Sequence, residues 1–270
     1  MIKDITIGQY FPGNSVIHRL DSRVKLLLDM LYLVILFTAQ SYTGILVGML
    51  FMVVCYILAR IRLTMIFKSI KPILPLMIFT GILNVLFIKG ETPLFHWWII
   101  EVYPEGIRTA LFMLLRIVAL IVGMSLLTYT TSPIMLTDAI ERLLGPLKKL
   151  HFPVHELSMM MTIALRFIPT LVEETDKIMS AQKARGAEID SGGLMKKAKA
   201  LIPVLIPLFV SAFKRANELA TAMECRCYHG GEGRTRLRQL KTAPRDYIAA
   251  AVMLALFAAV IVINCFPILP

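Results

Sequence analysis

Charged residues and cysteines are both scarce in this sequence. Charged side chains make up 17% of the 270 residues, against about 25% in an ordinary soluble domain. Two of the four cysteines, Cys55 and Cys265, lie in apolar segments, and the other two, Cys225 and Cys227, lie in a basic one. This distribution argues against a disulfide framework. The first residues also lack the apolar core of a signal peptide.

Sequence motifs of enzymes, nucleotide-binding proteins and metal proteins are missing as well. There is no GxxxxGK[ST] loop to bind ATP, and the five histidines form no HExxH motif. Cys225, Cys227 and His229 lie close together, but no second pair of ligands follows at zinc-finger spacing. We therefore predict no catalytic residues, no metal site and no cofactor in this chain. A membrane-embedded enzyme remains only as an alternative.

Apolar sequence, by contrast, is abundant. Hydrophobic residues make up 57% of the chain, the mean hydropathy is +0.71, and the excess is concentrated in five runs. A helix needs about 20 apolar residues to cross a bilayer, and flanking side chains can extend a shorter run. We predict five transmembrane helices, at residues 24–39, 44–59, 73–88, 107–129 and 247–266.

The net charge of +11 has two possible meanings. In a soluble protein it would suggest nucleic acid, but no nucleic-acid-binding motif accompanies it. In a membrane protein, Lys and Arg accumulate in the loops that stay in the cytoplasm. Basic residues precede the first apolar run and separate the second from the third, whereas the turn after the first is uncharged. This alternation predicts a multi-pass protein of the cell membrane, in contact with the lipid bilayer and not with nucleic acid, whose N-terminus is cytoplasmic.

One long region separates the fourth apolar run from the fifth. Ser132-Pro133 begins a first helical pattern in it, which Pro146 bends or ends. Two longer patterns follow at residues 153–182 and 194–226, and each is apolar at its start and polar at its end. We predict three parts of the chain: residues 1–130 with four transmembrane helices, residues 131–245 with long amphipathic cytoplasmic helices, and residues 246–270 with the last transmembrane helix.

The two long patterns end alike, on Arg185 and on Arg226. Small residues flank each arginine, and these are Ala184, Gly186, Cys225 and Cys227. A single arginine in the last turn of a helix is explained by the helix dipole, at about 0.3–1 kcal/mol. Two of them on similar helix ends make docking to another protein as good an explanation. Small neighbours let a helix end enter a groove, and a guanidinium offers a planar fork to a carboxylate.

Three longer motifs follow one another along the chain. The first is GxYxPGxSxxHRLDxRxK at residues 8–25, the second is RFIP with AQxARG at residues 166–186, and the third is RAxxLAxAMExR at residues 215–226. In this order, on a chain with five apolar runs, they resemble the transmembrane T component of energy-coupling factor transporters. The last arginine motif of that family is usually Ala-Arg-Gly, and here Cys225 and Cys227 stand beside the retained Arg226.

The resemblance implies a fold, a function and a set of partners. The fold is an all-α integral membrane protein with about five transmembrane helices plus long amphipathic cytoplasmic coupling helices. Such a subunit is not an enzyme. It links two cytoplasmic ABC-type ATPases, which bind the ATP, to a small substrate-binding membrane subunit, the S component, for uptake of a vitamin or metal ion. A self-sufficient secondary transporter is the alternative, although that class often carries internal repeats.

The resemblance also assigns roles to residues. Arg185 and Arg226, with their four small neighbours, are expected to enter grooves on the two ATPases. The membrane-facing surface of the coupling helices is expected to carry the S component. Methionine repacks easily against a moving or exchangeable partner. The predicted S-component contacts are Met159, Met160, Met161 and Leu205.

Overall fold

The computed structural model describes residues 10–62, 64–90, 95–97, 100–150, 152–187, 193–230 and 242–265. Nearly all of them are helical, which confirms the predicted all-α membrane fold. They form two compact units, which we call the bundle unit (residues 10–139 and 242–265) and the long-helix unit (residues 140–230). The three-part division at residues 130 and 245 stays a prediction, and Gly8 of the N-terminal motif lies outside the described residues.

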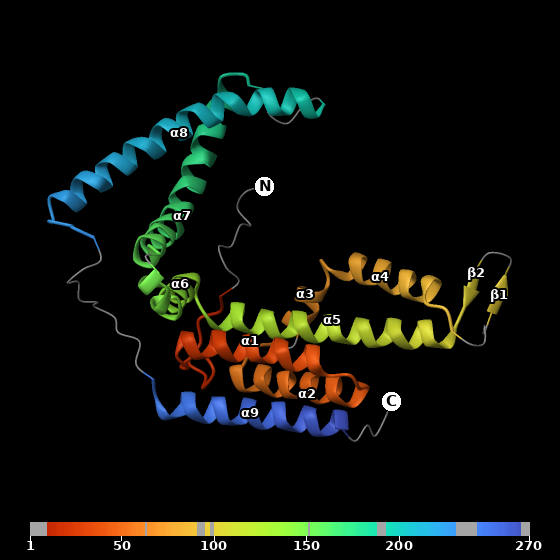
Figure 1. The fold of residues 1–270 in the computed structure, drawn as a ribbon. Coiled ribbons are helices and arrows are strands. Elements are labelled where there is room, and N and C mark those ends of the chain that lie inside the picture. The colour runs from red at the N-terminus through yellow and green to blue at the C-terminus, as the bar shows by residue number, and fades with distance from the viewer. Residues whose placement is uncertain are drawn as a thin grey trace. The chain divides into compact units, whose positions relative to one another are not determined.

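Four helices of the bundle unit run side by side (Figure 1). They are α1 (Ser22–Thr38), α2 (Tyr42–Ala59), α5 (Pro104–Thr130) and α9 (Pro244–Cys265). The side chains of Asp21 and Ser41 accept backbone hydrogen bonds at the starts of α1 and α2, and a proline begins each of the other two helices. Helices α2, α5 and α9 are long and apolar enough to cross a membrane, with mean hydropathies of 2.2, 2.5 and 2.7. Helix α1 has 17 residues.

The third predicted span, residues 73–88, corresponds to α4 (Leu74–Phe87), which forms a bent pair with the shorter helix before it. Helix α3 (Thr64–Ile70) is followed by α4 at an angle of 64°. Pro72 lies in the break and has no amide hydrogen to continue a helix. Both helices pack on α5. A short antiparallel hairpin of β1 (Phe95–Trp97) and β2 (Ile100–Val102) then leads into α5.

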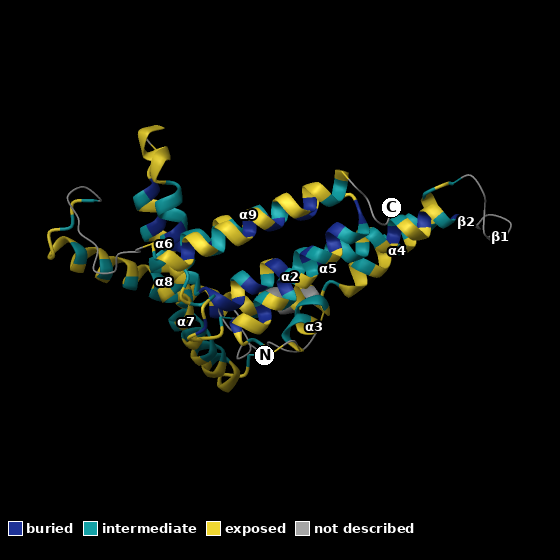
Figure 2. Ribbon diagram, turned by 90° about the horizontal axis from the view of Figure 1, so that it is seen from below, coloured by how far each residue is buried: buried dark blue, intermediate teal, exposed yellow. Residues whose placement is uncertain are grey.

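The core of the bundle unit is built around Tyr32 of α1, which has no exposed surface. Its ring lies against α5, where a Cβ atom at Gly123 would come within 2.5 Å of it, so only glycine allows this approach. Its hydroxyl donates to the carbonyl oxygens of Gly48 and Ala119, each at 3.4 Å. Figure 2 shows buried residues on the inward sides of these helices and exposed ones on their outer sides. The exposed apolar side chains of the outer sides suit a lipid environment.

A polar cluster joins three helices at one end of the bundle unit. The backbone amide of Asp21 donates to the Asp246 carboxylate at 2.9 Å, which ties the start of α1 to the start of α9. The ammonium of Lys25 donates to the carbonyl oxygen of Thr130 at 2.9 Å, which ties α1 to the end of α5. All four residues are buried. We call this the basic end of the bundle, because Arg19, Arg23, Arg60, Arg62, Lys68, Lys71 and Arg245 also lie near these helix termini.

Two ionisable residues within the spans, Asp29 and Arg116, do not pair with each other in the described part of the chain. The guanidinium of Arg116 donates to the carbonyl oxygen of Ala39 at 2.6 Å and lies 4.7 Å from the centre of the Phe112 ring. The sequence prediction was that both residues pair with each other or with polar neighbours. For Arg116 a polar neighbour is found, and it is the carbonyl of Ala39, the residue that follows α1.

Candidate docking site on the two long helices

The long-helix unit begins with a tight connection between α6 (Pro133–Leu143) and α7 (Val154–Ala184). A 3-10 turn, η1 (Gly145–Leu150), separates them, in agreement with the predicted break at Pro146. The Glu141 carboxylate spans this turn, because it accepts the Ser158 hydroxyl at 2.5 Å and lies 3.1 Å from Nδ1 of His155. These contacts fix the start of α7 to the end of the preceding segment.

Helices α7 and α8 (Leu194–Glu224) pack against each other in antiparallel orientation (Figure 1). Each has 31 residues, which corresponds to roughly 46 Å. The Gln182 side chain donates to the carbonyl oxygen of Pro203 at 3.3 Å. Three prolines lie inside these helices, Pro169 in α7 and Pro203 and Pro207 in α8, yet both helices continue past them. The helix bounds agree with the predicted patterns at residues 153–182 and 194–226 to within two residues.

A second contact joins the two helices further along their length. Glu174 of α7 accepts a short hydrogen bond from the Ser211 hydroxyl and pairs with the Arg215 guanidinium at 3.0 Å. The Ser211 hydroxyl, and then the Arg215 guanidinium, hold the pKa of the Glu174 carboxyl below its ordinary value. Sequence reasoning missed this contact. The available signal was the spacing of Ser211 and Arg215, because residues four apart share one face of a helix.

The end of α7 is a compact turn that presents Arg185. The Gly186 amide donates to the carbonyl oxygen of Lys183 at 3.0 Å, and the Ala187 amide reaches back to that of Gln182 at 3.0 Å. Gly186 has a φ of 87°, in the left-handed region. This is the Schellman arrangement, in which glycine is the usual left-handed residue. Arg185 is the residue immediately before it and is exposed.

The end of α8 repeats this turn around Arg226. The Cys227 amide donates to the carbonyl oxygen of Glu224 at 2.9 Å, and the Tyr228 amide reaches back to that of Met223 at 3.1 Å. Cys227 has a φ of 54° and so occupies the position that Gly186 takes after α7. Arg226 again precedes the left-handed residue and is exposed. The two arginine motifs therefore have the same backbone conformation despite their different neighbours.

The structure does not bring the two arginines together. Arg185 lies three residues beyond Gln182, which contacts Pro203 of α8. From Pro203 the chain follows α8 to Arg226, a distance of roughly 35 Å at ~1.5 Å per residue. The small neighbours Ala184, Gly186, Cys225 and Cys227 are exposed with them. Two exposed arginines this far apart suit two separate grooves and not one.

The apolar face of α8 is largely uncovered. Val204 is 2% exposed, whereas Leu205 is 57% and Phe209 is 66% exposed, and Figure 2 shows the same helix in the colours of exposed and intermediate residues. On α7, Met160 and Met161 are 55% and 44% exposed. The remaining predicted contact, Met159, is half-buried. Packing of α7 on α8 thus buries little of this apolar surface.

The sequence was also compared with known proteins. It matches the family model CbiQ, described as cobalt transport protein, over residues 13–237. It is 55% identical over 257 residues to the energy-coupling factor transporter transmembrane protein EcfT of Clostridium kluyveri, covering 95% of both chains. The identity to the protein of the same name is 51% over 264 residues in Ruminiclostridium cellulolyticum, covering 98% of both chains. In Bacillus subtilis it is 48% over 258 residues, covering 94% of this chain and 97% of the relative.

Proposed function

This chain belongs to the family of transmembrane T components of energy-coupling factor transporters, and we propose that it links two cytoplasmic ABC-type ATPases to a substrate-binding S component. It is a multi-pass membrane protein and a subunit of a transporter. The proposal adds the mechanical role: ATP-driven movement of the ATPases passes through α7 and α8, the coupling helices, to the S component. The S component holds the substrate, a water-soluble vitamin or a transition-metal ion.

The duplicated helix ends carry this proposal. Both coupling helices end in a Schellman turn that exposes an arginine one residue before the left-handed position. Such a turn satisfies the last backbone groups of the helix by itself, so the arginine side chain is free to bind elsewhere. A guanidinium binds a carboxylate through two parallel hydrogen bonds, which makes it suited to a groove lined by acidic groups. Two such ends, separated along α8, match two ATPase subunits.

The uncovered apolar face supports a membrane-embedded partner. Large exposed apolar side chains occur on both helices, Leu205 and Phe209 on α8 and Met160 on α7, and isolated soluble proteins rarely leave large apolar patches open. The S component is the partner whose own apolar surface suits this face. Movement of the coupling helices would then reach it directly, because the same helices carry the ATPase contacts at their ends.

The direction of the chain in the membrane follows from its charges. The starts of α1 and α9 and the end of α5 meet at the basic end of the bundle. Positively charged segments near spans remain in the cytoplasm. We therefore place the basic end, and with it the N-terminus, on the cytoplasmic side. The chain leaves α5 towards the coupling helices at this same end, where the ATPases would be.

The experiment is co-purification of the ATPases with variants of this chain. We expect Arg185→Ala with Arg226→Ala to lose both ATPases while the variant still inserts into the membrane. Removal of one side of a buried charge pair commonly costs about 2–5 kcal/mol. Each single variant should show an intermediate loss. Retention of both ATPases and transport at the wild-type rate by the double variant would refute the proposal.

Two controls separate this effect from general damage. Lys148→Ala with Lys149→Ala removes the same charge from exposed positions in η1 of the same unit, and it should retain both ATPases. Met161→Asp with Leu205→Asp places charge on the exposed apolar face and should have the reciprocal effect, loss of the S component with retention of the ATPases. Equal loss of all partners by either control would indicate misfolding and would remove the support for separate sites.

A further inference from the structure

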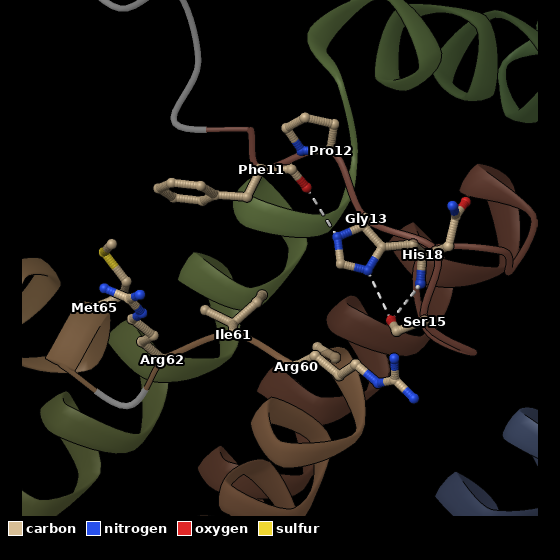
Figure 3. A pocket seen from close by; sticks show the side chains of 11 residues that line it. Phe11, Pro12, Gly13, Ser15, His18, Arg60, Ile61, Arg62 and Met65 are labelled. Carbon is tan, nitrogen blue, oxygen red and sulfur yellow. Dashed lines mark hydrogen bonds between the residues drawn. The ribbon is translucent and has the colours of Figure 1, made fainter.

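The N-terminal motif forms an ordered loop, residues 11–18, that the proposed coupling role does not explain. The ring of His18 lies at its centre and is held on both sides (Figure 3). Its Nε2 lies 2.9 Å from the carbonyl oxygen of Phe11, and its Nδ1 lies 2.7 Å from the Ser15 hydroxyl. Burial lowers the pKa of His18, so the neutral ring donates through Nε2 and accepts the Ser15 hydroxyl at Nδ1. A Cβ atom at Gly13 would come within 2.9 Å of this ring, which explains the glycine of the motif.

The loop is fastened to the rest of the bundle unit. The Phe11 amide donates to the carbonyl oxygen of Tyr129 at 3.0 Å, and the two rings meet edge to face at 5.5 Å. The Tyr129 hydroxyl lies 2.6 Å from the Ser69 hydroxyl of α3. The loop, the end of α5 and α3 are thus joined by direct contacts. A loop fixed in this way is preorganised to form one wall of a ligand site.

This wall closes one side of a pocket of about 420 Å³. The opposite side is the end of α2 and the segment after it, from Ala59 to Arg62, with Met65 of α3. Small-ligand sites commonly have volumes of about 300–1,000 Å³. The pocket lies where α2, one of the spanning helices, ends, so it opens at the membrane boundary.

The pocket combines an apolar interior with a positively charged rim. Phe11, Pro12, Ile61 and Met65 supply apolar surface, and the polar groups include two guanidinium groups. No carboxylate occurs among the described residues that line it. Figure 3 shows the Arg60 and Arg62 side chains leaving the chain on either side of Ile61, so that they flank the pocket. Both arginines are exposed, and none of the hydrogen bonds or ion pairs between described residues engages either guanidinium.

The backbone at Arg60 points to a use for its side chain. Arg60 has a φ of 57° and ends α2 in the left-handed region, where glycine is the usual residue. A non-glycine residue in this conformation is strained, and such strain concentrates at ligand-binding positions. The Arg60 amide caps α2 by bonding to the carbonyl oxygen of Ile57 at 3.0 Å, which any residue could do. An arginine at this position brings a positive charge to the pocket.

We propose that this pocket binds the headgroup of an anionic phospholipid, with its phosphate on Arg60 or Arg62 and its glycerol region against Phe11, Ile61 and Met65. Guanidinium groups bind phosphate oxygens through paired hydrogen bonds, and basic pockets beside membrane helices favour anionic headgroups. The apolar interior distinguishes a lipid from free phosphate, which would leave that surface uncovered. Because the loop also contacts α3 and the end of α5, the bound lipid would anchor this end of the bundle in its leaflet.

Native mass spectrometry of the purified full-length chain tests the proposal, with phosphatidylglycerol and phosphatidylcholine as probes. We expect Arg60→Gln with Arg62→Gln to lower the retention of phosphatidylglycerol at least about tenfold, with phosphatidylcholine unaffected. Lys68→Gln with Lys71→Gln is the matched control, because it removes the same charge from exposed positions in and after α3. This control should change retention less than about twofold.

A second variant tests the pocket without removing any positive charge. Ile61→Trp fills the pocket and leaves both arginines in place, and it should also lose phosphatidylglycerol. Equal loss in the lysine control would show general surface attraction and overturn the proposal. Full competition by inorganic phosphate at the same concentration as the lipid would overturn the assignment to a lipid. Retention of phosphatidylglycerol at the wild-type level by the arginine variant would contradict the proposal.

Discussion

The left-handed positions after the two coupling helices hold different residues in the same region of backbone conformation. Gly186 adopts its φ of 87° without strain, and among the described residues other than its two chain neighbours no atom lies within 4 Å of where a Cβ would be. Cys227 adopts a φ of 54° and carries a side chain. A non-glycine residue costs about 1–2 kcal/mol in the left-handed region. The departure from the family's usual Ala-Arg-Gly motif therefore makes the end of α8 less stable than the end of α7 with no change of shape.

Exchange of these two residues makes the difference measurable. Gly186→Ala should cost about 1 kcal/mol, because only backbone strain opposes it, and the Ala187 amide should exchange its hydrogen about fivefold faster. Cys227→Gly should have the opposite effect on the Tyr228 amide, with slower exchange by a few-fold. Hydrogen–deuterium exchange of the last turns gives both values. Unchanged exchange in both variants would mean that the turns are held by something other than their own hydrogen bonds.

The arginines were predictable from the sequence, and the geometry around them was not. Arg185 and Arg226 were singled out because each ends a long amphipathic pattern among small residues. The shared left-handed conformation of Gly186 and Cys227 was not predicted, because cysteine rarely adopts it. Likewise no pattern in the sequence shows that Tyr32 packs against Gly123, since that contact depends on how two helices approach each other.

At the scale of elements, the long helices were the most predictable. Their apolar-to-polar pattern extends over many turns, so their bounds were found to within two residues. Helix α3 was missed because the predicted apolar run begins only at Ile73, and the basic residues Lys68 and Lys71 made the segment before it resemble a loop. The β1–β2 hairpin was missed because strands of three residues are too short to show an alternating pattern.

We expect the contact of Glu174 with Ser211 and Arg215 to hold α7 and α8 together as one element. Glu174→Gln should loosen it, and spin labels at the exposed Ser180 and Asn217 should report a broader distribution of distances at pH 7. The folded state lowers the pKa of Glu174 from its ordinary 4.5. The contact is therefore fully present above pH 4.5 and is lost as the pH falls through the lowered value.

Wild type and variant should then differ in their response to acid. The wild-type distribution should broaden only below the ordinary pKa of the carboxyl, and that of Glu174→Gln should show no such step. Glu173→Gln is the matched control, because the Glu173 carboxylate is exposed and lies next to Glu174 in the chain. Its distance distribution should respond to acid as that of the wild type does. A wild-type distance distribution that does not respond to Glu174→Gln would show that apolar packing alone holds the two helices together.

At the scale of the whole molecule, the proposed coupling role depends on surfaces that the described residues leave exposed. Exposed arginines end both coupling helices, the apolar face of α8 is uncovered, and the basic end of the bundle gathers the termini of α1, α5 and α9. The five apolar runs in the sequence were enough to predict a membrane bundle. The direction inferred from the charge alternation stays a prediction. Which surfaces stay uncovered depends on packing, so the sequence alone did not show it.

The central claim is that the two helix ends engage two ATPase subunits at the same time. Photo-cross-linking residues at positions 184 and 225 of one chain, in the assembled transporter, test it directly. The account predicts a product that contains this chain and two ATPase subunits, and a product with one ATPase from a chain labelled at either position alone. A doubly labelled chain that links to only one ATPase subunit, or to none, would contradict the account.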